Sequence, residues 1–127
     1  MEVTIRRDDE ARLLFLTVTG DQTLEETLAL EEQIAKSGAW GFRWLIDERN
    51  AHVHLSSTDI RTVFARGQLL TATYGPRGPV AVVAGAVHDY GVDRMASAYA
   101  DIAGVTFEAF TTIEEAEAWL RQQVSRS

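Results

Sequence analysis

Two histidines and two serines lie close together in the middle of the chain, in the segment NAHVHLSST (residues 50–58). Alternate residues of an extended segment point the same way, so His52 and His54 could bind one metal ion together. The other ligands are missing, because the sequence contains neither HExxH nor any cysteine. We therefore expect His52 and His54 to be exposed loop residues, and we expect no metal and no cofactor.

The serines allow two interpretations. Ser56 precedes a helical pattern and Asp59 follows three residues later, which is the spacing of a capping box. The free N–H groups and the positive end of the helix dipole at such a position also favour a phosphate. A cap and a phosphate switch are not exclusive, so Ser56 and Ser57 are both structural candidates and candidate phosphorylation sites.

A second group of polar residues follows two predicted strands. Asp47 and Arg49 end one strand, and His88 follows another. Parallel strands end at the same edge of a sheet, where ligands commonly bind, so these residues and Ser56 would form one polar mouth. Caps and salt bridges at a loop edge would explain the same residues. A hydrolase would need a serine in GxSxG, which is absent, so an enzyme using His88 and Asp47 is only a remote alternative.

The elements that position these residues alternate between strand and helix patterns. The run PVAVVAG is apolar throughout, which predicts an interior strand of a parallel sheet. The first two strands read as an antiparallel hairpin at one edge. We predict an α/β fold of order ββαβαβαβα with a mostly parallel sheet. The strand patterns cover residues 2–7, 12–20, 42–48, 79–85 and 105–110, and the helical patterns cover 23–38, 56–75, 88–104 and 111–123.

Length and composition restrict the class of protein. The chain has 127 residues, which predicts a single domain over residues 1–124 with a flexible tail at 125–127. Twelve basic and nineteen acidic residues give a net charge of −7, which opposes binding to nucleic acid. We find no apolar run long enough to span a bilayer and no signal-peptide pattern, so we expect a cytoplasmic protein.

Four stretches, in this order and spacing, resemble the STAS domain family and its SpoIIAA-like branch of small stand-alone proteins. They are RWLIDERNA, GPVAVVAG, YGVDRMASAYAD and TIEEAEAWL. The resemblance covers nearly the whole chain. It implies a small α/β sandwich without catalytic activity that binds a regulatory protein or, in some relatives, an apolar or lipid-like ligand.

The resemblance also implies roles for individual residues. Ser56 and Ser57 fall where anti-sigma-factor antagonists of the family carry Asp-Ser-Ser-Gly, but Leu55 and Thr58 replace the aspartate and the glycine. Arg94 and Met95 match an Arg-Met pair of the family. Arg94 would bind an anionic group or cover the sheet edge with its stem. We expect inward positions in this helix at Val92, Met95, Ala96, Tyr99 and either Ile102 or Ala103.

These observations predict a non-enzymatic binding or regulatory protein. Its partner would be a protein or a small apolar or lipid-like ligand, and the chain could also form a homodimer. The expected partner surface comprises Asp47, Arg49, His88, Arg94 and Trp40, the last because aromatic side chains dominate interfaces. The alternative is an anti-sigma-factor antagonist switched by phosphorylation of Ser56.

Overall fold

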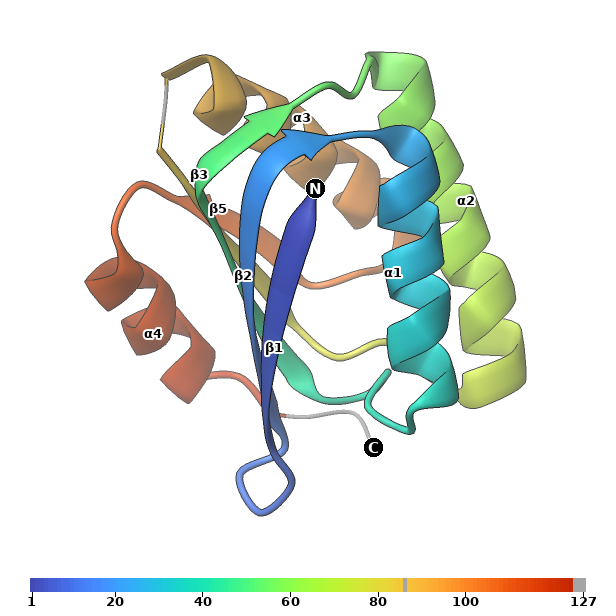
Figure 1. The fold of residues 1–127 in the computed structure, drawn as a ribbon. Helices are drawn as coiled ribbons and strands as arrows, with labels where there is room; N and C mark the ends of the chain where they lie inside the picture. The colour runs from blue at the N-terminus through green and yellow to red at the C-terminus, as the bar shows by residue number, and fades with distance from the viewer. Residues whose placement is uncertain (86, 125–127) are drawn as a thin grey trace.

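A computed structural model describes the backbone of residues 1–85 and 87–124 and the side chains of residues 1–85 and 91–124. The described elements follow the predicted order (Figure 1). The strands are β1 (Glu2–Asp8), β2 (Leu13–Gln22), β3 (Arg43–Val53), β4 (Val80–Ala84) and β5 (Phe107–Phe110), and the helices are α1 (Leu24–Lys36), α2 (Ser57–Tyr74), α3 (Val87–Ala103) and α4 (Ile113–Arg121).

The sheet explains which face each helix covers. Its strands lie in sequence order, with β1 antiparallel to β2 and each later pair parallel. Each crossover connects a strand to its neighbour in the same direction across the sheet. Because such crossovers are right-handed, their helices all lie on one face. Accordingly α1, α2 and α3 cover one face, and α4 covers the other (Figure 1). β4 is buried throughout its length and lies between β3 and β5, as the apolar run predicted.

β3 is longer than its sequence pattern predicted, which corrects the assignment of His52 to a loop. The strand continues to Val53 and pairs with the end of β2. One extra residue of β3 lies between the pairs Thr17–Asp47 and Thr19–Asn50, which is a β-bulge. Side chains alternate along a strand, so the bulge reverses which positions face α1–α3. The polar sequence after Asp47 concealed this continuation.

Three helices begin at residues whose side chains cap them, and the cap of α2 is the one that the spacing of Ser56 and Asp59 predicted. Thr23 caps α1 and Thr112 caps α4, each by accepting a hydrogen bond from the backbone N–H three residues on. Ser56 caps α2 in the same way, and Asp59 returns the bond, which completes the capping box. α3 begins at Val87, and the side chains of residues 87–90 lie outside the described residues.

Glycines on both sides of β4 permit close contact between neighbouring chain segments. A Cβ atom at Gly78 would overlap the backbone oxygen of Phe42, and one at Gly85 would overlap that of Arg49. Any side chain at either position would force the backbones apart. These two residues therefore allow the chain on either side of β4 to lie against Phe42, just before β3, and against Arg49 within β3.

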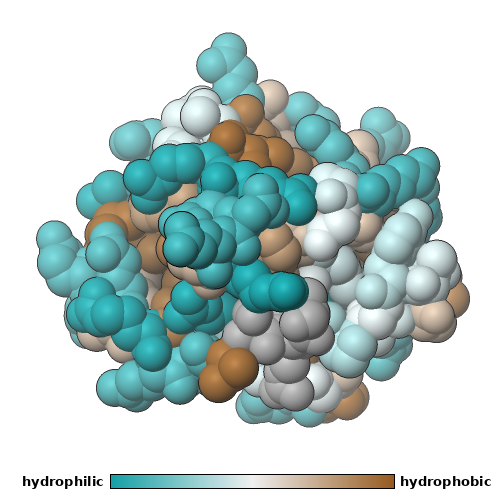
Figure 2. All heavy atoms as spheres, turned by 90° about the horizontal axis from the view of Figure 1, so that it is seen from below, coloured by the Kyte–Doolittle hydropathy of each residue, from teal (hydrophilic) through white to brown (hydrophobic). Residues whose placement is uncertain are grey.

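The inward face of α3 differs in part from its prediction. Val92 and Ala96 are buried, with Tyr99 and Ala103 packed against the same cluster. Met95 is 38% exposed and Ile102 is 83% exposed, so neither fills the core. The fully buried position of the last turns is Ala100, whose small side chain lets α3 lie close to the sheet. On the face that carries the end of the hairpin, hydrophilic side chains predominate, with apolar patches between them (Figure 2).

Candidate functional site

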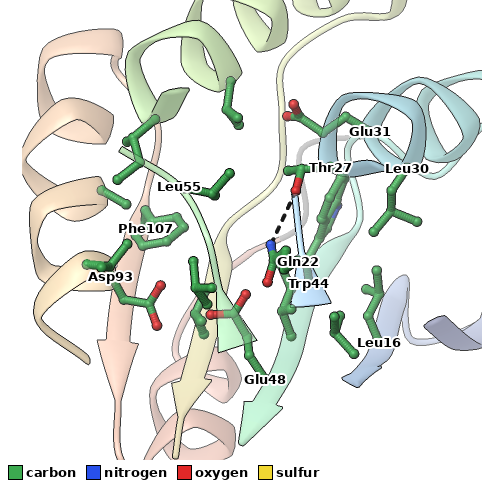
Figure 3. Close-up of a pocket in the computed structure, with 18 of the residues that line it drawn as sticks. Leu16, Gln22, Thr27, Leu30, Glu31, Trp44, Glu48, Leu55, Asp93 and Phe107 are labelled. Carbon is green, nitrogen blue, oxygen red and sulfur yellow. Dashed lines mark hydrogen bonds between the residues drawn. The ribbon is translucent and has the colours of Figure 1, made fainter. Parts of the chain in front are cut away.

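A cavity of about 100 Å³ lies between the sheet and helices α1, α2 and α3 (Figure 3). Its wall is mainly aliphatic and aromatic, because the strands and helices that enclose it turn their apolar faces toward each other. The described residues of this wall include Val18, Leu30, Ile46, Phe64, Val82 and Ala96. An enclosure of this composition suits an apolar ligand.

A buried ion pair interrupts one end of this apolar wall. Glu31 of α1 accepts a hydrogen bond of 3.3 Å from Nη1 of Arg77, which lies in the loop before β4. The Arg77 guanidinium lies 4.8 Å from the ring centroid of Trp40 and 4.5 Å from that of Trp44. The aromatic faces stabilise the cation, which has left water, through cation–π attraction. The pair thus joins α1, the loop before β4 and the start of β3.

Burial moves both pKa values of this pair toward the neutral forms. Loss of hydration raises the pKa of Glu31, although the positive charges of Arg77 and Arg66 oppose the rise. Loss of hydration lowers the pKa of Arg77, and Glu31 opposes that change. Burial therefore disfavours the charged form of each side chain, and the attraction between the two charges opposes this effect.

The opposite end of the cavity carries three more polar side chains. Gln22, Glu48 and Asp93 are all buried and all line the cavity. Gln22 donates a hydrogen bond of 3.4 Å from Nε2 to Thr27 Oγ1. The carboxyl groups of Glu48 and Asp93 point toward one another across the cavity (Figure 3). The cavity therefore has an apolar middle between two polar ends.

The predicted polar mouth does not assemble around Asp47 and Arg49. Leu45 packs against α4, and Asp47, two residues further along β3, faces the same side. Asp47 instead binds Arg49, with Oδ1 accepting from Nε at 2.9 Å and Oδ2 from Nη2 at 3.0 Å. Burial alone would raise the pKa of Asp47, but the hydrogen bonds and charge of Arg49 outweigh it and lower the pKa. The side chain of His88 lies outside the described residues.

The two histidines differ in their contacts. His52 is exposed on β3, whereas Nε2 of His54 lies 3.0 Å from Oδ1 of Asp21. Within residues 1–85 and 91–124, no group of three histidine, aspartate or glutamate side chains could hold a metal ion.

Ser56 and Ser57 are exposed at the start of α2. Oγ of Ser56 accepts from the Asp59 N–H at 3.1 Å, and the Asp59 carboxylate accepts from the Ser56 N–H at 3.0 Å. The serine hydroxyl is thus accessible while serving as a cap. The Asp59 carboxylate beside it would repel a phosphate.

The other predicted surface residues differ in exposure. Arg94 is exposed and binds Glu108 of β5 at 2.7 Å, so its head covers the sheet edge. Trp40 is only 1% exposed, and its Nε1 donates to Thr71 Oγ1 at 3.1 Å. The prediction that Trp40 contacts a partner is therefore corrected. The glycine-flanked Trp40 looked like part of an exposed loop, but it packs beneath α2.

The sequence contained signals for the cavity residues that we did not use. Glu31 follows Leu24 and Leu28 at helical spacing, so it lies on the apolar stripe of α1. Gln22 continues the alternation of buried residues in β2. A polar residue in an inward position is the informative exception to a hydrophobic pattern. Arg77 had no such signal, because it lies in a loop.

Similarity to known proteins is found at the level of the fold. No family model matches the sequence, and no curated protein matches it. Solved structures do match over nearly the whole chain, and they give the described residues a SpoIIAA-like fold, as the sequence resemblance predicted.

Three of these structures are informative. An uncharacterised DUF3478-family protein with a SpoIIAA-like fold from Shewanella loihica PV-4 has 18% identity and a TM-score of 0.57, over 94% of this chain and 92% of its own. The anti-sigma factor antagonist SpoIIAA in its unphosphorylated form has 14% identity and a TM-score of 0.54, over 95% and 99%. An anti-sigma factor antagonist from Mycobacterium paratuberculosis has 19% identity and a TM-score of 0.52, over 95% and 96%.

The helices of the described residues do not meet the requirements for a membrane-spanning helix. No helix there combines the length and the apolar character that a bilayer span requires.

Proposed function

We propose that the protein is a non-catalytic regulatory protein that binds a small apolar ligand in the cavity beneath α1, α2 and α3. The observation that carries this proposal is the cavity itself, which is lined mainly by apolar side chains and has a volume of about 100 Å³. Apolar cavities of about 150 Å³ are known to hold benzene. The cavity of this protein is smaller, so it fits the end of a longer apolar chain, or an aromatic ring if the wall moves slightly apart.

The SpoIIAA-like fold supports a regulatory role, since two similar solved structures are anti-sigma factor antagonists. A ligand between the sheet and three helices would bias how those helices pack. Such packing changes can alter the surface that a protein partner recognises. Binding of the ligand would therefore regulate binding of a protein partner to the helical face.

The first test is a mass spectrum of the protein purified from its native host, recorded under native and denaturing conditions. Added mass that appears only in the native spectrum would support the proposal and identify the ligand. A matched pair of variants locates the site. Ala96→Leu fills the cavity and should abolish the added mass, whereas Ala98→Leu, exposed on the same helix, should retain it. A bare chain in the native spectrum of the wild type would contradict the proposal.

The second candidate function is a phosphorylation switch at Ser56. It is favoured by the exposed hydroxyl at the N-terminus of α2, where a phosphate adds a charge of about −2. The denaturing spectrum tests it directly, because a covalent phosphate persists there. Phosphate that maps to Ser56 and is absent from Ser56→Ala would support the switch. A spectrum without phosphate from cells in several growth states would count against it.

A further inference from the structure

One end of the cavity presents hydrogen-bonding atoms that have no partner among the described residues. They are Nε1 of Trp44, Oε1 of Glu31 and Nε of Arg77. Trp44 is 2% exposed and Glu31 is 4% exposed, and the side chain of Arg77 is 8% exposed. A buried polar atom without a partner is costly, so native proteins rarely leave three together.

The three side chains form a compact cluster on the cavity wall. Arg77 bonds to Glu31 at 3.3 Å and lies 4.5 Å from the Trp44 ring. The unpartnered atoms comprise two N–H donors and one carboxylate acceptor. A hydroxyl group matches this set, because it accepts through its oxygen and donates through its hydrogen.

The charges of the cluster select against an ionised ligand. Arg77 and Glu31 already neutralise each other. An added carboxylate would place a second anion beside Glu31 in a buried site, and a buried charge without a partner is strongly unfavourable. The cluster therefore suits a neutral group.

We propose that Glu31, Trp44 and Arg77 form a recognition site for one neutral hydroxyl group on an otherwise apolar ligand. This inference rests on the proposed function, since it assigns the ligand class of the same cavity. The apolar middle of the cavity holds the body of the ligand, and the cluster orients it.

The test compares three probes that differ in their polar group. Phenol and toluene have nearly the same shape, but only phenol carries a hydroxyl, and benzoate supplies the anionic counterpart. We expect phenol to bind about tenfold more tightly than toluene, the effect of about one net hydrogen bond. We expect benzoate to bind more weakly than phenol. Titration calorimetry measures the affinities.

A matched pair of variants assigns the effect to Trp44. Trp44→Phe removes the indole N–H but keeps an aromatic ring and leaves Glu31 and Arg77 in place, so the preference for phenol over toluene should become smaller. Trp119→Phe makes the same change on α4, outside the cavity wall, and should leave both affinities unchanged. The wild-type indole N–H resonance of Trp44 provides a second readout that needs no variant, and phenol should shift it more than toluene does.

The outcomes separate this inference from the proposed function. Toluene binding as tightly as phenol, in the cavity and without a specific shift of the Trp44 resonance, would overturn the hydroxyl site but support an apolar ligand site. Tightest binding of benzoate would overturn the preference for a neutral group. Binding of none of the three probes at millimolar concentration would overturn both, and ordered water would then be the partner of these atoms.

Discussion

Ser56 shows how one residue can satisfy a structural requirement and remain chemically accessible. Its hydroxyl accepts from the Asp59 N–H while its side chain stays exposed. The capping box explains the serine completely in structural terms. Any regulatory role would therefore be added to a residue that the fold already needs.

The capping role of Ser56 predicts a loss of stability when its hydroxyl is removed. Ser56→Ala should lower the free energy of unfolding by about 1 kcal/mol and the melting temperature by about 4 °C, because the Asp59 N–H in the first turn of α2 loses its side-chain acceptor. Ser57→Ala is the matched control, since Ser57 is the neighbouring exposed residue and lies inside the helix. Equal melting temperatures for Ser56→Ala and the wild type would exclude Ser56 as a stabilising cap.

Asp47 makes a prediction about pH. Its pKa is lowered in the folded protein, because the hydrogen bonds and charge of Arg49 outweigh the effect of burial. A carboxylate whose pKa is lower in the folded protein than in the unfolded chain stabilises the fold at pH values above its unfolded pKa. This stabilisation is lost as the pH falls through the folded pKa. Asp47→Asn should therefore destabilise the protein by about 1 kcal/mol at neutral pH. The difference should shrink as pH falls from the unfolded pKa of this carboxyl toward its lower folded pKa.

Thermal unfolding of both proteins between neutral and acid pH measures this effect. Asp101→Asn provides a control at an exposed position of α3. A difference between the wild type and Asp47→Asn that stays constant with pH would contradict an electrostatic contribution of Asp47.

At the scale of elements, α2 shows how the cavity cluster depends on helix packing. Gly67 lies in the interior of this helix, where glycine is unfavourable. A Cβ atom there would lie 3.6 Å from Oε2 of Glu31 and 3.8 Å from Nη1 of Arg77. These are ordinary van der Waals distances, so there is room for a methyl group but not for a longer side chain.

The distances predict opposite effects for two substitutions. Gly67→Ala should raise the free energy of unfolding by about 0.5–1 kcal/mol, because alanine is the better helix former and its methyl group fits. Gly67→Leu should destabilise the protein, because its side chain would displace Glu31 or Arg77. Chemical denaturation measures both changes. A loss of stability in Gly67→Ala would mean that the ion pair needs the space beside it.

At the scale of the whole molecule, the Glu31–Arg77 pair connects segments that are distant in the sequence. It joins α1 to the loop before β4 and rests on tryptophans that precede and begin β3. We infer that the pair fixes how α1 packs against the loop before β4, but it does not guarantee stability, since burial opposes both charges.

A double-mutant cycle tests this interpretation. Glu31→Leu should destabilise the protein by about 3 kcal/mol, because Arg77 would remain buried without its carboxylate. Adding Arg77→Leu should recover much of that loss, since two apolar side chains no longer need each other. Urea denaturation of the four proteins measures the coupling. Additive losses in the double variant would show that the two side chains stabilise the fold independently.

Local patterns in the sequence determined most of the fold. The capping residues, the apolar run of β4 and the alternation of strands and helices predicted the element order and the parallel sheet. These features depend on neighbours in the chain, so periodicity and cap spacing report them directly. The extension of β3 was not predicted, because pairing with β2 overrides a polar local sequence.

Only the tertiary structure decided the candidate site. From the sequence we expected Asp47, Arg49 and Ser56 to lie together because all three follow or end predicted strands. In the structure, Asp47 is on the face of the sheet that α4 covers, and α1–α3 cover the opposite face. Conversely, Glu31 and Arg77 are 46 positions apart and meet in the core. A sequence pattern reports which side of an element is apolar. The distance between side chains from different elements depends on how those elements pack, and that is where the cavity and its polar cluster arise.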